Sequence, residues 1–174
     1  MQPLIEAAQK IRLAVFDVDG VLTAGTLSYG VDGIERKHFH VHDGQGMKCL
    51  QKSGVAIAII TSCRTEMIQR RMKDLGVLHV YQGIQDKLPA YEDLKQKLNL
   101  QDEEIAYVGD DLPDLPMLTR VGLAVTVPNA PRIIQQYVHW TTNAPGGNGA
   151  VREVCDFIMQ AQGTFQSIIH SYLR

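Results

Sequence analysis

Five short runs of apolar residues recur along the chain, and they restrict its fold more than any other feature. The runs are LAVFDV (13–18), VAIAIIT (55–61), LHVY (78–81), IAYVG (105–109) and LAVTV (123–127). A strand with one exposed face would alternate apolar and polar residues, whereas these runs are apolar at nearly every position. Such runs are typical of parallel strands that are buried on both faces. The sequence therefore predicts a mainly parallel sheet with helices on both sides.

The segments between these runs have the patterns of amphipathic helices. The expected helices cover residues 46–54, 66–76, 87–100 and 113–122. The second of them ends at Gly76, and glycine is the commonest residue just beyond a helix. Strands that alternate with helices indicate a doubly wound, Rossmann-like α/β fold. A chain of 174 residues fills one such unit, so we expect one domain over residues 1–174.

Three segments depart from this alternation. Residues 26–42, TLSYGVDGIERKHFHVH, have the pattern of two strands around an Asp32-Gly33 turn, which predicts a β-hairpin projecting from the domain. Residues 143–162 form a glycine-rich loop that leads into a further expected helix, and residues 163–174 are expected to form a short tail.

Composition excludes several classes of partner. The formal net charge is −2, with 17 Lys and Arg against 19 Asp and Glu, so we expect no nucleic-acid surface. Residues 1–12 lack the pattern of a signal peptide, and no run reaches the roughly 18 apolar residues that span a membrane. Cys49, Cys63 and Cys155 are odd in number and widely spaced, which favours a reducing cytoplasm. We expect a cytoplasmic protein that acts on a small molecule.

Acidic residues follow the first apolar run. Asp17 and Asp19 lie one residue apart, so in an extended chain their carboxylates point to the same side. Because the carboxyl ends of parallel strands meet at one edge of the sheet, the polar residues that follow the other runs are expected to join them there. These residues are Thr61, Ser62, Lys87, Asp110, Asp111 and Asp114.

The chemistry of this set favours a metal ion and a phosphoryl group. Two carboxylates about 4 Å apart repel each other by roughly 4 kcal/mol at an effective dielectric constant of 20, and a divalent cation offsets that cost. Oxygen ligands without cysteine or histidine favour Mg²⁺ over zinc. A hydroxyl group, a lysine and the amides at helix starts suit phosphoryl oxygens. Since uncatalysed hydrolysis of phosphate esters is extremely slow, we also expect a covalent nucleophile.

The order of these motifs resembles a known superfamily. DVDGVLT (17–23), IIT (59–61), Lys87 and YVGDDLPD (107–114) resemble the four motifs of the haloacid dehalogenase superfamily. The hairpin and the stretches FHVHDGQG, RRMKDLG, YQG, GDDLPDLP and GGNGAVREVCDFI extend the resemblance over nearly the whole chain. Together they resemble a branch without a cap domain whose members hydrolyse 3-deoxy-D-manno-octulosonate 8-phosphate. The resemblance implies a Mg²⁺-dependent sugar-acid phosphatase of lipopolysaccharide precursor biosynthesis.

The resemblance also assigns roles to individual residues. It makes Asp17 the nucleophile that forms an aspartyl-phosphate. It makes Asp19 the general acid and base, with its backbone carbonyl facing the metal, and Asp110 completes the Mg²⁺ site. Asp111 and Asp114 would orient the metal ligands. The residues expected to bind phosphate or substrate are Thr61, Ser62, Arg71, Lys87 and Arg152, and Lys87 would also neutralise charge during catalysis.

The resemblance further implies a homotetramer. In such an assembly the hairpins pack together and a neighbouring subunit helps to close each site. The tail, or the GGNG loop with Arg152, would then reach the substrate in an adjacent subunit.

Two departures from the family pattern leave an alternative substrate open. The family usually has Gly-Arg after the hydroxyl residue of the second motif, where this chain has Ser62-Cys63 followed by Arg64. It usually has Arg-Asp-Gly where this chain has His42-Asp43-Gly44. Arginine binds carboxylates with two parallel hydrogen bonds, which neither histidine nor cysteine can reproduce. A nine-carbon sugar acid 9-phosphate therefore remains an alternative substrate.

Other kinds of function and site also remain open. A phosphoacceptor signalling domain would place its acidic acceptor after the third strand, where this chain offers only Asp86, and a non-catalytic scaffold could retain the fold. The aspartates could also be helix-capping residues. His38, His40 and His42 would share one face of a strand and could bind zinc.

Overall fold

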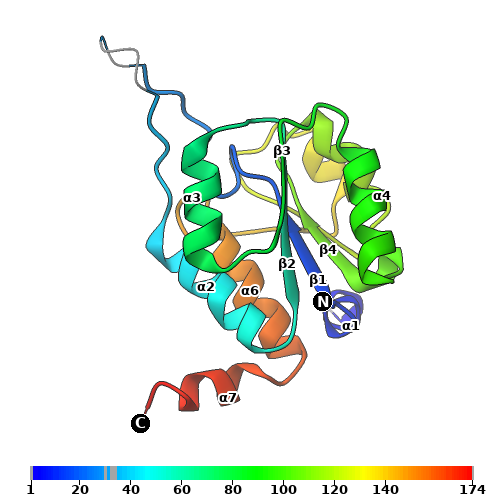
Figure 1. Ribbon diagram of the computed structural model, residues 1–174. Helices are drawn as coiled ribbons and strands as arrows, with labels where there is room; N and C mark the ends of the chain where they lie inside the picture. Colours follow the sequence, from blue (N-terminus) through cyan, green and yellow to red (C-terminus); the bar gives the residue numbers. More distant parts are fainter. Residues whose placement is uncertain (1, 30, 32–34, 174) are drawn as a thin grey trace.

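The computed structural model describes residues 2–29, 31 and 35–173 and contains a six-stranded parallel sheet (Figure 1). The strand order is β3-β2-β1-β4-β5-β6. The strands are β1 (Leu13–Phe16), β2 (Ala56–Thr61), β3 (His79–Gln82), β4 (Ile105–Val108), β5 (Leu123–Thr126) and β6 (Trp140–Thr141). The five predicted runs correspond to β1 to β5, and each observed bound lies within two residues of the predicted one. The two-residue strand β6 was not predicted.

Helices connect the strands as expected, with additions at both ends of the chain. The α-helices are α1 (Gln2–Gln9), α2 (Val41–Lys52), α3 (Glu66–Leu75), α4 (Lys87–Leu98), α5 (Leu115–Leu118), α6 (Ala150–Ala161) and α7 (Phe165–His170). Short 3₁₀ helices are η1 (Asp102–Glu104), η2 (Leu112–Asp114) and η3 (Ile134–Tyr137). The helix expected over 113–122 is divided between η2 and α5. Pro116 at the start of α5 has no N–H to continue the hydrogen bonding of η2.

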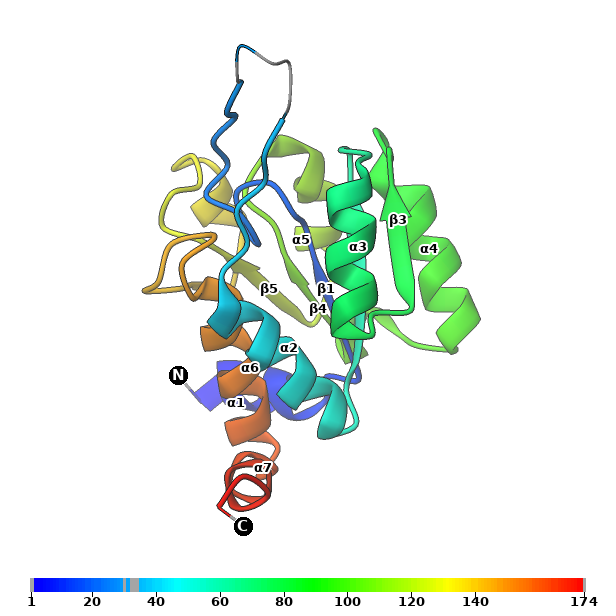
Figure 2. The ribbon, with the colours of Figure 1, turned by 60° about the vertical axis from the view of Figure 1, so that its left-hand side comes forward.

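Both faces of the sheet are covered, as the apolar runs predict. Ala14 and Phe16 of β1 belong to a buried cluster with apolar side chains of α2, α3 and α6. Leu13 and Val15 point to the other face and join a cluster with α4 and α5. The helices accordingly form a layer on each side of the strands (Figure 2). Alternation along a fully buried strand thus divides its side chains between two separate cores.

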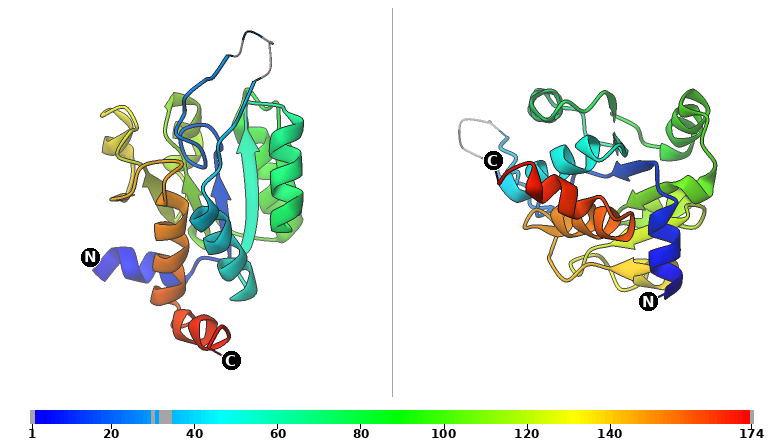
Figure 3. Two further views of the ribbon diagram at one scale, coloured as in Figure 1. Left: turned by 90° about the vertical axis from the view of Figure 1, so that its left-hand side faces the viewer. Right: turned by 90° about the horizontal axis from the view of Figure 1, so that it is seen from below.

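A projecting segment, residues 24–40, joins the first strand to α2. Its two limbs run away from the body of the domain (Figure 3, left) and meet at one antiparallel bridge, Tyr29 with Glu35. The prediction of two regular strands over 26–42 is therefore wrong for the described residues, because residues 41 and 42 begin α2. The expected turn residues Asp32 and Gly33 lie outside the described residues. Two strands without a further strand or helix to cover them are marginally stable, which accounts for the short pairing.

The C-terminal residues form a helix where a tail was expected. Ile168 of α7 is buried against the rest of the domain. Gln45 Nε2 of α2 donates a hydrogen bond of 2.8 Å to the hydroxyl oxygen of Tyr172, and Lys52 Nζ donates one of 2.7 Å to Ser171 Oγ. The helix α7 thus packs against the rest of this chain. No helix in the described part of the chain has the length and apolar character needed to cross a membrane.

Candidate active site

The order of the strands determines where the polar residues meet. The chain passes from β1 outward to β3 and then returns to β4 on the other side of β1. Ligands of such sheets bind where the strand order reverses, outside the carboxyl ends of the strands. Asp17 follows β1 directly, and Asp110 lies two residues beyond β4. Thr61 ends β2 and Lys87 begins α4, so both also reach this edge.

A cleft of about 270 Å³ opens at this edge. Its lining residues are Asp17, Asp19, Gly25, Thr61, Ser62, Cys63, Lys87, Asp110, Asp111, Pro113 and Asp114. Most of the residues predicted for the site therefore lie together. Arg71 and Arg152 do not line the cleft.

Lys87 lies at the bottom of the cleft between two carboxylates. Its side chain is 2% exposed, and its Nζ atom is 3.0 Å from Asp17 Oδ2 and 2.6 Å from Asp114 Oδ1. Burial alone would lower the pKa of Lys87, but the charges of Asp114 and Asp17 raise it above its ordinary value. The ammonium group therefore stays charged and is held by both carboxylates.

Asp114 is fully occupied by protein donors. Its Oδ1 also accepts a hydrogen bond of 2.8 Å from the hydroxyl of Tyr107, and its Oδ2 accepts from the backbone N–H groups of Asp110 and Asp111. Gly109 permits this arrangement, because a Cβ atom there would lie 2.4 Å from Asp114 Cγ. Asp114 thus fixes Lys87 and the backbone that carries Asp110.

The carboxyl groups of Asp17 and Asp110 both have raised pKa values. Burial, followed by the charge of Asp114, raises the pKa of Asp17 to about 6, although Lys87 opposes the shift. Burial and the charges of Asp17, Asp114 and Asp111 raise the pKa of Asp110 to about 7. Ionising both groups near neutral pH therefore requires more positive charge than Lys87 alone provides.

These carboxylates fit a Mg²⁺ ion. Oxygen atoms of Asp17, Asp110 and Asp114 lie within 4.8 Å of one another. Each oxygen of Asp114 meets two protein donors, whereas each oxygen of Asp17 meets one, so Asp17 and Asp110 have more capacity left for a hard cation. Gly20 leaves room for the Asp110 carboxylate, because a Cβ atom at position 20 would lie 1.9 Å from Asp110 Oδ2. Asp111 is exposed and caps η2 by accepting a hydrogen bond from the N–H of Leu112.

Thr61 ends β2 and Ser62 follows it, and the two residues use their hydroxyl groups differently. Thr61 is buried, and its Oγ1 accepts a hydrogen bond of 3.2 Å from the N–H of Cys63. Its own hydroxyl hydrogen remains available for a ligand in the cleft. Ser62 Oγ donates a hydrogen bond of 3.0 Å to the carbonyl oxygen of Ile84, so its hydroxyl supports the loop after β3.

Asp19 has a partner that sequence reasoning missed. Lys37 Nζ lies 2.6 Å from Asp19 Oδ1, and the Lys37 side chain is 4% exposed although it belongs to the projecting segment. Burial alone would lower the pKa of Lys37, but the hydrogen bond and charge of Asp19 raise it. A signal existed in the sequence. If His38 and His40 share one side of an extended limb, Lys37 and Phe39 share the other, and Phe39 packs against the core.

The glycine-rich loop before α6 supports the loop that carries Asp17 and Asp19. Gly146 lies so close to it that a Cβ atom would lie 1.7 Å from the carbonyl oxygen of Gly20. Asn129 joins the two loops, since its Nδ2 donates to that same carbonyl and its Oδ1 accepts from the N–H of Gly146. On α2, the buried Asp43 accepts hydrogen bonds from the N–H groups of Gly149 and Arg152. The loop is therefore a packed part of the site's framework.

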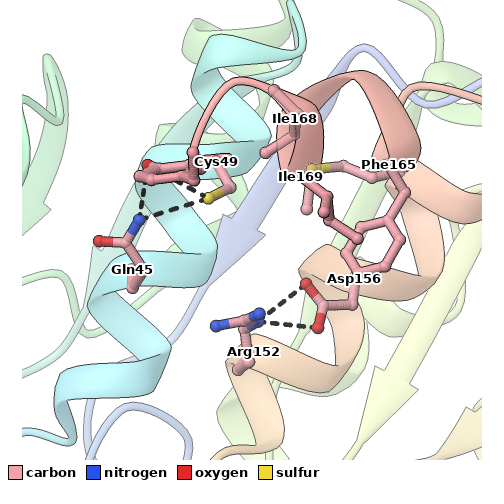
Figure 4. Close-up of a pocket in the computed structure, with 9 residues that line it drawn as sticks. Gln45, Cys49, Arg152, Asp156, Phe165, Ile168 and Ile169 are labelled. Atoms are coloured by element: carbon pink, nitrogen blue, oxygen red, sulfur yellow. Dashed lines mark hydrogen bonds and ion pairs between the residues drawn. The ribbon is translucent and has the colours of Figure 1, made fainter. Parts of the chain in front are cut away.

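Arg71 and Arg152 make contacts outside the cleft. The guanidinium of Arg71 lies over the ring of Phe39 and donates to the carbonyl oxygen of His40. Arg152 forms an ion pair with Asp156, one turn further along α6, in a second pocket lined by α2, α6 and α7 (Figure 4). Within one subunit neither side chain meets the cleft, so their roles in substrate binding stay predictions.

The alternative sites receive little support. His42 lies in the first turn of α2, and His40 caps that helix by accepting a hydrogen bond at Nδ1 from the N–H of His42, so the two histidines do not share the face of a strand. The metal-like cluster found among the described residues contains aspartates alone. Burial raises the pKa of the Cys63 thiol, which disfavours the thiolate that a nucleophilic cysteine requires.

Comparisons with known proteins agree with this geometry. A sequence model of the haloacid dehalogenase-like hydrolases matches residues 75–154. A 3-deoxy-D-manno-octulosonate 8-phosphate phosphatase of Yersinia pestis is 46% identical over 159 residues, which cover 91% of this chain and 85% of the relative. The enzyme of that name from Escherichia coli K12 is 44% identical over 160 residues, covering 92% and 85%.

A solved structure extends the likeness to nearly every residue. The 3-deoxy-D-manno-octulosonate 8-phosphate phosphatase of Moraxella catarrhalis, solved with a magnesium ion, a phosphate ion and a KDO molecule, is 41% identical to this chain. The match has a TM-score of 0.96 and covers 99% of both chains.

Proposed function

The chain belongs to the haloacid dehalogenase-like hydrolases, and from that premise we propose what it does. It is a Mg²⁺-dependent phosphatase that hydrolyses 3-deoxy-D-manno-octulosonate 8-phosphate to the free sugar acid and phosphate. The observation that carries this conclusion is the match to the Moraxella enzyme over 99% of both chains, in a protein whose cleft brings together Asp17, Lys87 and Asp110.

In the first step Asp17 attacks phosphorus, and the bond between phosphorus and the sugar oxygen breaks. The N–H of Val18 lies 2.7 Å from Asp17 Oδ1 and Lys87 lies 3.0 Å from Oδ2, so the carboxylate is held in one orientation. Lys87 and the hydroxyl of Thr61 stabilise the phosphoryl oxygens as charge develops on them. Asp17, Asp110 and the backbone carbonyl of Asp19 would hold a Mg²⁺ ion, which would further neutralise that charge.

Asp19 moves the protons. In its protonated form it donates to the oxygen of the leaving sugar, which departs as an alcohol and leaves an aspartyl-phosphate on Asp17. The Asp19 carboxylate then accepts a proton from water as the water oxygen attacks phosphorus. The bond between phosphorus and Asp17 breaks, phosphate leaves, and both residues return to their starting states.

Substrate assays test this function directly. We expect the highest kcat/KM for 3-deoxy-D-manno-octulosonate 8-phosphate among phosphorylated eight- and nine-carbon sugar acids. His42 and Cys63 replace usual features of the family, so the nine-carbon acid is the most informative competitor. An equal or higher kcat/KM for that competitor would contradict the proposed substrate while leaving the phosphatase chemistry intact.

A homotetramer is part of the proposal. Leu27, Tyr29 and Val31 of the projecting segment expose their apolar side chains, with Tyr29 at 80%, and a surface of this kind is often covered by another subunit. Light scattering is expected to give four times the monomer mass, and Tyr29→Ser is expected to weaken the assembly. A monomeric mass at assay concentration would end this part of the proposal.

The cellular setting follows from the substrate. We place the enzyme in the cytoplasm, in lipopolysaccharide precursor biosynthesis. The free cysteines support this location, since Cys49 and Cys155 are buried as thiols.

A further inference from the structure

The side chain of Lys37 is almost completely covered, although the residue belongs to a segment that projects from the domain. It lies on the returning limb of the projecting segment, between Arg36 and His38, both of which are exposed. Its own side chain is 4% exposed, and its Nζ atom lies 2.6 Å from Oδ1 of Asp19, which lines the cleft. A second carboxylate, Glu35 Oε1, lies 3.5 Å away. Burying an ammonium group is costly unless it is paired, so this placement depends on Asp19.

The contact restricts one oxygen of Asp19. Oδ1 receives Lys37 and, at 3.4 Å, the hydroxyl of Thr23, which lies on the same loop. The described residues make no hydrogen bond to Oδ2. The Asp19 side chain is 38% exposed and lines the cleft, so it has room to rotate if Oδ1 is released. Lys37 thus determines which oxygen is left for proton transfer.

We propose that Lys37 is a positioning residue that holds Asp19 in the orientation for proton transfer. The proposal rests on the function given above, in which Asp19 donates a proton to the leaving sugar and later accepts one from water. Lys37 acts only through Asp19, whereas Lys87 contacts the nucleophile itself. Because Lys37 belongs to the projecting segment, the position of that segment controls the proton-transfer steps.

Two substrates with different leaving groups distinguish a role in proton transfer from a general structural role of Lys37. A sugar alkoxide needs a proton as it departs, whereas p-nitrophenolate departs without one. We expect Lys37→Met to lower kcat for 3-deoxy-D-manno-octulosonate 8-phosphate by about 10- to 100-fold, with KM changed less than about threefold. With p-nitrophenyl phosphate, rapid mixing is expected to show an unchanged rate of aspartyl-phosphate formation. The later turnover should be slow, because hydrolysis of that intermediate still needs Asp19.

Three further variants sharpen the test. Adding Lys37→Met to Asp19→Asn is expected to cause no additional loss, because both substitutions remove the same contribution. Lys37→Arg keeps a charged donor and is expected to restore much of kcat. Lys48→Met is the matched control, since Lys48 is exposed on α2, and it is expected to behave as wild type. Lys37→Gln keeps a polar donor and replaces Lys37→Met if the latter does not fold.

The outcomes distinguish the two proposals. Equal losses in the burst rate and in steady-state turnover, or multiplicative losses in the double variant, would overturn the role of Lys37. If wild type hydrolysed p-nitrophenyl phosphate but not the sugar acid phosphate, the proposed substrate would be wrong. The burst and double-variant measurements would still decide the role of Lys37.

Discussion

Two lysine–aspartate pairs contribute side chains to the same cleft, Lys87 and Asp114 from one pair and Asp19 from the other, and the pairs are built from different parts of the molecule. The inner pair is Lys87 with Asp114, and the outer pair is Lys37 with Asp19; the ammonium–carboxylate distance is 2.6 Å in both. In the inner pair the side chains are 2% and 1% exposed, and both come from elements packed on the sheet. In the outer pair Asp19 is 38% exposed, and Lys37 comes from the projecting segment.

The comparison shows that equal distances do not mean equal roles. A buried charge that loses its partner is left uncompensated, which typically costs about 3–5 kcal/mol. A partly exposed carboxylate is solvated when its partner is removed, so its ion pair contributes about 1 kcal/mol or less. We therefore expect the inner pair to support both the fold and the charge balance of the site, whereas the proposed role of the outer pair is to orient Asp19.

The largest effect is expected at Asp17, which contacts the lysine of the inner pair. Asp17→Asn removes the proposed nucleophile while preserving its size, and kcat should fall by about 10⁴-fold or more. No burst should be seen with p-nitrophenyl phosphate, because no aspartyl-phosphate can form. The exposed Asp74 on α3 offers a matched control, and Asp74→Asn should retain wild-type kinetics. A phosphatase rate unchanged by Asp17→Asn would contradict the mechanism.

Removing the inner lysine should affect both activity and stability. Lys87→Met leaves Asp17 and Asp114 without their shared counter-charge, so kcat is expected to fall by about 10²- to 10³-fold. The free energy of unfolding should fall by about 3–5 kcal/mol for the same reason. Urea denaturation measures the stability, and Lys48→Met provides the control. A stable but inactive Lys87→Met would show that the inner pair serves catalysis alone.

The stability of the metal-free protein should depend on pH through the carboxyl groups of Asp17 and Asp110. The pKa values of Asp17 and Asp110 are raised to about 6 and about 7, so the folded state binds protons more tightly than the unfolded chain does. The stability from these groups is complete below pH 4 and is lost progressively as the pH rises from 4 to about 7. With EDTA present, we expect the free energy of unfolding to fall by several kcal/mol between pH 4 and pH 8.

A matched variant isolates this effect from other titrations. Asp110→Asn removes one of the mutually repelling carboxylates, so its unfolding free energy should depend much less on pH than that of wild type. Adding Mg²⁺ at pH 8 should stabilise the wild type more than this variant. Parallel stability curves for the two proteins would contradict the raised pKa values.

Sequence patterns predicted which inner residues meet in the cleft, because their positions follow from the sheet. Asp17, Thr61 and Asp110 lie at or just beyond the carboxyl ends of buried parallel strands, and ligands of such sheets bind at those ends. Resemblance to the family then suggested their roles. The neighbours of long side chains on helices were less predictable. Neither Arg71 nor Arg152 lines the cleft of this chain. Motif spacing does not specify which neighbour a long side chain meets.

The contact between Lys37 and Asp19 was harder to predict, because local sequence patterns do not determine how the projecting segment lies against the domain. The direction of the Lys37 side chain depends on how the projecting segment returns to the body of the domain. The described residues of that segment pair through the bridge between Tyr29 and Glu35 instead of forming the regular hairpin expected there. The strand β6 and the helix α7 were missed because two and six residues are too short for a periodic signal. One sequence pattern could have indicated this contact. In an extended limb, Lys37 and Phe39 point to the side opposite to that of His38 and His40.

The smallest effect is expected for the stability of Lys37→Met, and it tests the comparison most sharply. Methionine fills the buried path of the lysine stem, and Asp19 stays 38% exposed and can be hydrated once its partner is gone. The free energy of unfolding should therefore fall by about 1 kcal/mol or less, well below the loss for Lys87→Met. Urea denaturation of both variants at one pH measures the difference. If the two losses were equal, the outer pair would belong to the structural core of the site, and the division between the two lysines would be wrong.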